Sequence, residues 1–201
     1  ITARVRCAKQ AAAAFDGAYV GLDIGPIGEL LFPMGRLAFD EAYALFAEQV
    51  EAGVKAGADA IFIETMTDLY EAKAAVLAAK EHSSLPVFCT MSFEKDGRTF
   101  TGCQLSAMAL TLSGLGVDGL GMNCSVGPVE MLEMAEEIQR YTGRLLVLDA
   151  MEYGMDAVDE GVRAYLEPAL FYAMNVELRA ARGKRFDHSP EIRRYMGIEK
   201  Y

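Results

Sequence analysis

The sequence predicts an α/β fold in which parallel strands alternate with helices. Three observations favour it: five short apolar runs, helical patterns between them, and a repeat of roughly 30 residues, which is typical of right-handed strand-helix-strand units. The predicted strands are Tyr19–Gly28, which runs into a glycine-proline turn, and Ala60–Ile63, Pro86–Phe93, Gly119–Asn123 and Leu145–Asp149. With 201 residues, 52% of them hydrophobic, the chain can bury the core of one domain.

The first two predicted helices end at glycines. Residues 1–9 are typical of the inside of a helix, Ala8–Phe15 is alanine-rich, which favours a helix, and Gly17 suits its end. Apolar side chains recur at steps of three and four residues from Phe39 to Val54. This spacing predicts an amphipathic helix that ends at Gly57.

Local signals also mark the later helices and one tight turn. Asp68 followed by Glu71 resembles a capping box, so a helix is predicted at Leu69–Lys80. The Asp96-Gly97 pair is typical of a hairpin turn. Two further helices are predicted at Leu105–Leu115 and Pro128–Tyr141.

The number of predicted strands indicates part of a barrel. A closed (β/α)8 TIM barrel takes eight strand-helix units and about 250 residues, so five units predict a partial barrel or an open sheet. Composition shifts near Met151: residues 1–150 carry 11 basic and 20 acidic side chains, whereas residues 151–201 carry 8 and 9. We therefore predict a barrel-like domain at 1–150 and a helical C-terminal extension at 151–201, whose apolar residues recur at helical spacing.

Composition excludes several classes of partner. A net charge of −10 argues against nucleic acid and anionic membranes, since both attract basic surfaces. No uninterrupted apolar run reaches the length of about 18 residues that a membrane span needs. The four cysteines, at positions 7, 89, 103 and 124, form no CxxC pair, which favours a reducing, cytoplasmic location. No Ser-His-Asp order or HExxH motif supports a hydrolase.

Chemically active side chains lie in or directly after three of the predicted strands. Cys124 comes directly after Gly119–Asn123, at the end of a strand where reacting groups collect in strand-helix repeats. Glu64 directly follows Ala60–Ile63, so its carboxylate is expected to need a partner or a site. Asp23 precedes a glycine-proline pair and either lines a site or shapes the turn.

Four phrases stand in order along these strands: Asp23-Ile-Gly-Pro-Ile-Gly-Glu29, Ile63-Glu-Thr-Met-Thr-Asp68, Met91-Ser-Phe93 and Gly121-Met-Asn-Cys-Ser-Val-Gly-Pro128. Together they resemble the homocysteine S-methyltransferase family, and most of all the homocysteine-binding barrels of cobalamin-dependent methionine synthases. The resemblance runs from about residue 8 to residue 149.

The resemblance implies a (β/α)8 barrel that forms methionine by transferring a methyl group to the sulfur of homocysteine. The family binds one zinc ion through three cysteines, and the zinc activates the substrate as a thiolate. Cys124 matches the first of these ligands, while Asn123 and Glu64 match positions around the substrate amino acid. Asp23 and Thr65 occupy equivalent strand ends and are expected to line the pocket.

The resemblance also implies partners that the chain itself does not supply. The methyl donor, methyl-cobalamin or methyl-folate, is expected on a corrinoid or folate domain, or on another protein. The family's other two zinc ligands are an adjacent Cys-Cys pair, and this sequence contains no such pair. The zinc site is therefore expected to be incomplete in this chain.

Two other interpretations stay open. The chain could be a non-catalytic barrel remnant that binds a small molecule or a partner, which predicts no zinc. It could also be a different phosphate-handling enzyme that uses the glycine loops at 25–28 and 125–127, although no lysine or arginine accompanies either loop. In either case an open sheet leaves edges that a second copy could pair, which favours a homo-oligomer.

Overall fold

Five parallel strands form one sheet in the computed structural model, which describes residues 1–15 and 17–149. Their order in the sheet is their order in the chain. The strands are β1 (Gly21–Ile24), β2 (Ala60–Met66), β3 (Val87–Met91), β4 (Gly119–Asn123) and β5 (Leu145–Asp149). The prediction of a partial barrel-like α/β fold is confirmed, whereas the predicted extension at 151–201 lies outside the described residues.

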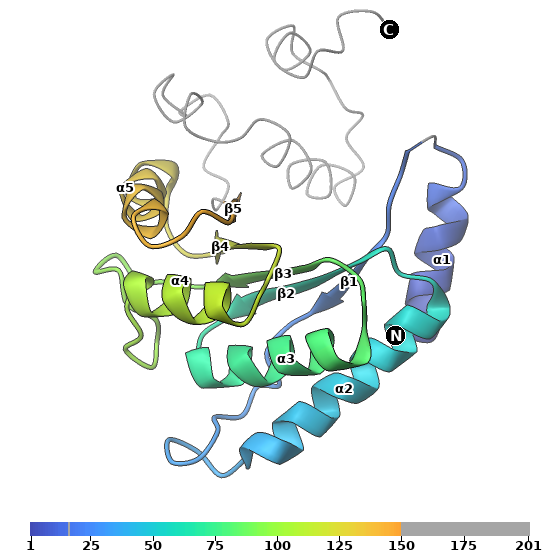
Figure 1. Cartoon of the computed structure of the whole chain (residues 1–201), viewed down its shortest axis with the longest axis horizontal. Coiled ribbons are helices and arrows are strands. Elements are labelled where there is room, and N and C mark those ends of the chain that lie inside the picture. Colours follow the sequence, from blue (N-terminus) through green and yellow to red (C-terminus); the bar gives the residue numbers. More distant parts are fainter. Residues whose placement is uncertain (16, 150–201) are drawn as a thin grey trace, which may run out of the picture.

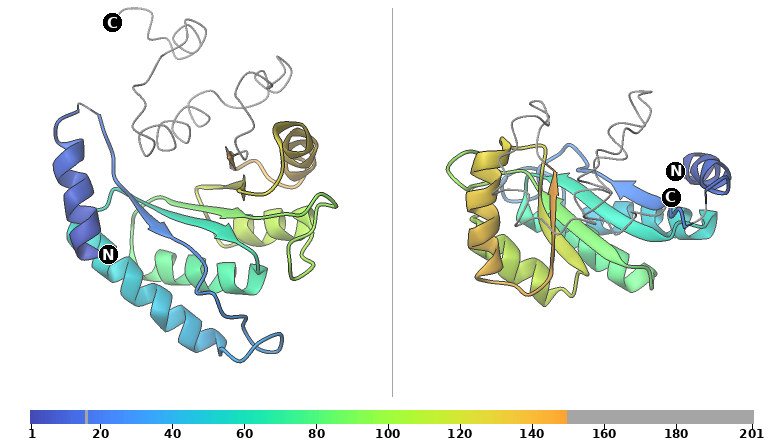
Figure 2. Two further views of the ribbon diagram at one scale, coloured as in Figure 1. Left: turned by 180° about the vertical axis from the view of Figure 1, so that it is seen from behind. Right: turned by 90° about the horizontal axis from the view of Figure 1, so that it is seen from above.

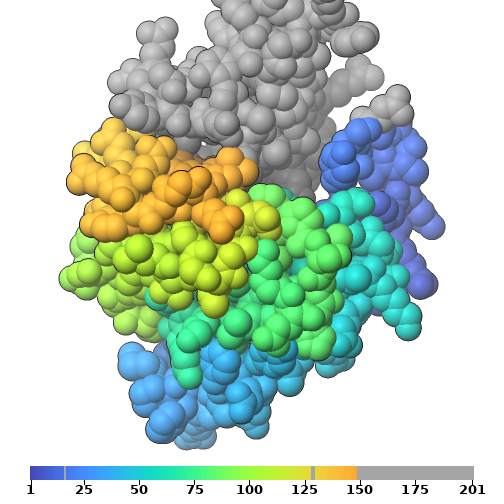
Figure 3. Space-filling view, in the orientation of Figure 1, coloured from blue at the N-terminus to red at the C-terminus, as the bar shows by residue number. Residues whose placement is uncertain are grey.

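A helix precedes the sheet, and a helix follows each of the first four strands. The helices are α1 (Thr2–Ala12), α2 (Phe39–Ala56), α3 (Leu69–His82), α4 (Leu105–Gly114) and α5 (Pro128–Gln139). Figure 1 shows α2 to α5 following one another around one face of the sheet. In Figure 3 the surface runs in the same order, from the blue segment after β1 to the orange α5 and β5.

Helix α1 ends earlier than predicted. It covers Thr2–Ala12, so the helical pattern at 1–9 is confirmed, whereas the alanine-rich stretch predicted a helix as far as Phe15. Val5 is buried in the core, Ala12 packs against it, and Lys9 is bonded to Asp59. Beyond Ala12 the chain continues in turns, and the Phe15 side chain is 71% exposed. Figure 2 shows α1 standing beside the end of α2.

The two faces of the sheet carry different side chains. Alternate residues such as Leu22, Ile63 and Met122 are buried against the helices. On the opposite face the rings of Phe62 and Phe88 stack with their centroids 4.8 Å apart. The glycines beside these rings, Gly21 and Gly119, leave the necessary space, since a Cβ at either position would lie 2.7 Å from a ring carbon. This face corresponds to the interior of a barrel.

Two helix-to-strand junctions have the same construction. Gly57-Ala58-Asp59 leads from α2 into β2, and Gly116-Val117-Asp118 leads from α4 into β4. Both glycines have a positive φ, of 98° and 77°. The Asp59 carboxylate accepts a hydrogen bond from the Val20 N–H at 2.7 Å, and the Asp118 carboxylate accepts one from the Val87 N–H at 2.8 Å. Each aspartate therefore fastens its own strand to the preceding strand.

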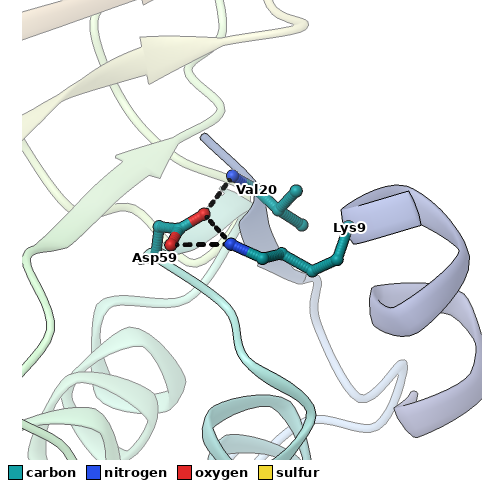
Figure 4. Close-up of polar contacts among 3 residues, drawn as sticks. All are labelled: Lys9, Val20 and Asp59. Carbon is teal, nitrogen blue, oxygen red and sulfur yellow. Dashed lines mark hydrogen bonds and ion pairs between the residues drawn. The ribbon is translucent and has the colours of Figure 1, made fainter. Parts of the chain in front are cut away.

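A lysine reinforces each junction. Lys9 of α1 contacts both oxygens of Asp59, at 2.9 and 3.0 Å, as Figure 4 shows. Lys80 of α3 donates to Asp118 at 3.2 Å. Because Lys9 and Val20 reach the same carboxylate, α1 is attached to the amino-terminal end of the sheet.

Substitution of Asp59 with alanine is expected to lower the free energy of unfolding by about 1–2 kcal/mol. Lys9 and the Val20 N–H hold the pKa of the Asp59 carboxyl below its ordinary value of 3.8. The stabilisation is complete above that ordinary value and is lost as the pH falls through the lowered pKa. Urea unfolding at about pH 7 and about pH 2.5 measures it, and the two proteins should converge in acid. Asp96→Ala, in an exposed hairpin, is the control, and an equal loss in both variants would contradict the expectation.

Candidate functional site

The five residues predicted to form the site all lie at the carboxyl ends of strands. Asp23 is on β1, Glu64 and Thr65 are on β2, and Asn123 and Cys124 are at the end of β4. Parallel strands bring these ends to one edge of the sheet, where the loops after β1 and β3 also project (Figure 1). The structure therefore places the predicted residues on one edge, with β3 between the β2 and β4 groups.

A bulge interrupts β2 at its carboxyl end. Ile63 pairs with Cys89 and Met66 pairs with Met91, so three steps along β2 lie opposite two steps along β3. Thr65, inside this bulge, has a φ of 60°. A left-handed conformation is unusual for a β-branched residue, and a bulge commonly redirects side chains beside a functional site.

The side chain of Asn123 connects the ends of three strands. Its Oδ1 accepts hydrogen bonds from the Thr65 N–H and from the Thr90 hydroxyl of β3, both at 2.9 Å. Its Nδ2 donates to Thr65 Oγ1 at 2.7 Å and lies 3.6 Å from Cys124 Sγ. Asn123 is 1% exposed, so this network forms the floor of the site.

Cys124 borders that floor through its Sγ and is exposed. Its φ of 50° is also left-handed, and the carbonyl that precedes it accepts from Ser92 Oγ at 3.0 Å and Ser125 Oγ at 2.7 Å. Ser125 Oγ in turn accepts from the Phe93 N–H at 2.9 Å. Two hydroxyls therefore fix the peptide group that joins Asn123 to Cys124.

Asp23 lies at the open side of the site. The residue is exposed, yet partial burial of its carboxyl raises its pKa above the ordinary value of 3.8. Its register partner on β2 is Phe62, whose ring covers the inner face below it. Asp23 can therefore meet a ligand at the rim of the site.

Glu71 holds the loop after β1, a role that the sequence analysis missed. Asp68 caps α3 as predicted, because its carboxylate accepts from the Tyr70 N–H at 3.0 Å. In a capping box the Glu71 side chain would accept from the backbone N–H of the cap residue. Here Glu71, which is 3% exposed, accepts from the Ile27 N–H at 2.6 Å. Burial raises the pKa of Glu71, the Ile27 bond opposes that shift, and the charge of Asp68 adds to it. The signal was a carboxylate beside the alanines that form the buried face of α3.

The described cysteines do not assemble around Cys124. Cys7 is exposed on α1, and burial in β3 raises the pKa of the Cys89 thiol to about 12. Cys103, after the hairpin that the sequence predicted, lies with its Sγ 3.3 Å from the Gln104 carbonyl oxygen. Within residues 1–15 and 17–149, no three or more histidine, cysteine, aspartate or glutamate side chains are grouped to hold a metal ion. A catalytic zinc takes three protein ligands, so this donor set does not fit it.

Sequence comparison places the chain among methyltransferases. The model of the family "Homocysteine S-methyltransferase" matches residues 1–191, which continues past the composition boundary near Met151. Methionine synthase from Mycobacterium tuberculosis is 33% identical over 128 residues, covering 61% of this chain and 11% of that protein. The Mycobacterium leprae enzyme is 31% identical over 128 residues and is covered to 10%. The chain thus spans about a tenth of the length of these relatives.

Solved structures show the same fold. The homocysteine methyltransferase MmuM from Escherichia coli, in its apo form, superposes with a TM-score of 0.60 at 22% identity, covering 71% of this chain and 54% of that one. Its metallated form gives a TM-score of 0.60 at 21% identity, with 73% and 57% covered. Among the described residues, no helix has the length and apolar character needed to cross a bilayer. From the extent of the family match, this chain belongs to the homocysteine S-methyltransferase family.

Proposed function

We propose that this chain forms part of a barrel that binds homocysteine and presents its sulfur to a methyl donor. The observation that carries the proposal is the group of Glu64, Thr65, Asn123 and Cys124 at one sheet edge, where Asn123 is hydrogen-bonded to Thr65 and Thr90. Family membership and the methionine synthase relatives support the substrate. A homocysteine-like amino acid has an ammonium, a carboxylate and a thiol, and this edge offers groups that suit such a molecule.

In this proposal Glu64 accepts hydrogen bonds from the substrate ammonium, while Asp23 and Thr65 line the pocket. A carboxylate beside a bound ammonium forms a charge-assisted pair, which is stronger than a neutral hydrogen bond. In the reaction the homocysteine thiol loses its proton and its sulfur forms a bond to the methyl carbon. The donor, methyl-cobalamin or methyl-folate on another domain or protein, leaves with the electron pair of the broken bond.

Cys124 as a zinc ligand is a separate proposal, which matches its exposed thiol at the end of β4. Two further thiols would have to come from outside this sequence, because its other cysteines do not gather around Cys124, so no step of the reaction is assigned to zinc here. A cytoplasmic location is likewise proposed, and the four free cysteines of this chain support it.

Replacing Glu64 with glutamine is expected to weaken homocysteine binding about ten-fold or more, because an ammonium loses its charged partner. Isothermal titration calorimetry of the full chain with homocysteine measures the dissociation constant. Glu133→Gln, which changes an exposed carboxylate on α5, is the matched control and should bind like the wild type. Equal affinities for all three proteins would remove Glu64 from the site.

The zinc proposal is tested by elemental analysis of purified protein. Zinc bound by the wild type is expected to be lost in Cys124→Ala and retained in Cys7→Ala, whose thiol lies on α1. A wild-type chain without zinc that still binds homocysteine would support the non-catalytic binding module.

A further inference from the structure

We propose that Asn123 is a positioning residue that sets the geometry of both Glu64 and Cys124. This inference rests on the proposed function, since it assigns the two strained segments a task at the homocysteine site. By resemblance alone, Asn123 is expected among the substrate contacts. Its surroundings point instead to a residue that acts through its neighbours.

The hydrogen-bonding capacity of the Asn123 amide is already filled. A side-chain amide has two lone pairs on its oxygen and two hydrogens on its nitrogen. Because the Thr65 N–H can only donate, the Asn123 atom that faces it must be Oδ1. The Thr90 hydroxyl donates to the second lone pair of that oxygen. The nitrogen is directed at Thr65 Oγ1 and Cys124 Sγ. With 1% exposure, Asn123 has neither surface nor hydrogen bonds left for a substrate.

Both left-handed residues of the described chain other than glycine contact Asn123. Thr65 has a φ of 60° and Cys124 a φ of 50°. Side chains disfavour this conformation, and it persists where surrounding contacts over-determine it. The Asn123 amide binds the backbone N–H and the hydroxyl of Thr65, and its Nδ2 lies 3.6 Å from Cys124 Sγ. One buried amide therefore holds both strained positions.

The Thr65 conformation has a direct consequence for Glu64. Ile63 and Met66 are both buried on the helix side of the sheet, although a regular strand would place residues 63 and 65 on the same side. The bulge at Glu64 and Thr65 adds one residue between Ile63 and Met66, so Met66 returns to the side of the sheet that Ile63 faces. Holding Thr65 thus fixes the direction in which Glu64 leaves β2. Asn123 lies on β4 and bonds to Thr65 on β2, and its Oδ1 also accepts from the Thr90 hydroxyl of β3, the strand between them.

The test combines a local measurement with a binding measurement on the full chain. Amide hydrogen exchange of Thr65, followed by NMR, reports the bond to Asn123, and calorimetry reports the homocysteine dissociation constant. Asn123→Ala is expected to accelerate Thr65 exchange about ten-fold or more and to weaken homocysteine binding by a similar factor. The control Ser113→Ala, which removes a hydroxyl pair with Thr142 between α4 and the start of β5, should change neither.

The conservative variant Asn123→Asp separates positioning from simple damage. It keeps an oxygen for the Thr65 N–H and the Thr90 hydroxyl, so it should restore Thr65 protection and most of the homocysteine affinity. If Asn123→Ala does not fold, Thr90→Val perturbs the same oxygen and should accelerate Thr65 exchange beyond that of Ser113→Ala.

Three results would decide against the proposal or its basis. Thr65 exchange in Asn123→Ala that stays at the wild-type rate overturns the role of Asn123 in holding the bulge. Faster Thr65 exchange with unchanged homocysteine affinity overturns its role in the site. A wild-type chain that does not bind homocysteine overturns the proposed function, and the Thr65 exchange rates then still support or overturn the hold on the bulge.

Discussion

Gly121→Ala is expected to lower the free energy of unfolding by about 3 kcal/mol or more. A Cβ at this position would lie 1.9 Å from the carbonyl oxygen of Val147, and 2.8 and 2.9 Å from its carbonyl carbon and nitrogen. These are backbone atoms of β5, the register partner of Gly121, so no side-chain rotation can relieve the contact. Relief requires the two strands to separate.

Urea unfolding followed by circular dichroism measures the effect. The matched control is Gly114→Ala at the end of α4, where an added Cβ meets nothing within 4 Å. That variant should be as stable as the wild type or slightly more stable, because alanine favours helices over glycine. A Gly121→Ala protein with wild-type stability would mean that β4 and β5 do not pack as described.

Glu71→Ala is expected to cost about 2 kcal/mol of unfolding free energy, because it leaves a cavity and an unpaired Ile27 N–H. Glu71→Gln keeps the shape and an oxygen for Ile27. It should therefore be at least as stable as the wild type near neutral pH.

The pH dependence of these two proteins follows from the pKa of Glu71. Burial raises that pKa above its ordinary value of 4.5, so the folded state holds the proton more tightly than the unfolded state does. The contribution of Glu71 to stability is fullest below 4.5 and falls as the pH rises through the raised pKa. Unfolding of wild type and Glu71→Gln at about pH 4 and about pH 7 should show the glutamine variant gaining relative stability at the higher pH. A constant difference between them would contradict this assignment.

The sequence predicts the strands well because each is a short apolar run bounded by helix signals. Ala60–Ile63 and Leu145–Asp149 are confirmed, although β2 continues to Met66. The helix starts at Phe39 and Leu69 are also confirmed, since spacing and the Asp68 cap are local properties of the chain. Helix α1 confirms the helical pattern at 1–9, but it ends at Ala12, three residues before the predicted end at Phe15.

The details of the site depend on contacts between distant residues, which explains why the sequence does not disclose them. Thr65 in the Glu64–Thr65 bulge is hydrogen-bonded to Asn123, 58 residues away. Likewise, Glu71 reaches Ile27, 44 residues away, where a local motif indicated a helix cap. The residue types at the strand ends were predictable, but the directions of their side chains were not.

The glycine-apolar-aspartate junctions have a further implication for how this family can change. They clamp neighbouring strands at the amino-terminal edge, through Asp59 and Asp118, whereas Glu64 and Cys124 lie at the opposite edge. The two edges can therefore accumulate mutations almost independently. A new substrate preference could evolve at the carboxyl ends of the strands while the Asp59 and Asp118 bonds still hold neighbouring strands together at the amino-terminal edge. The order of the strands in the sheet would then stay the same.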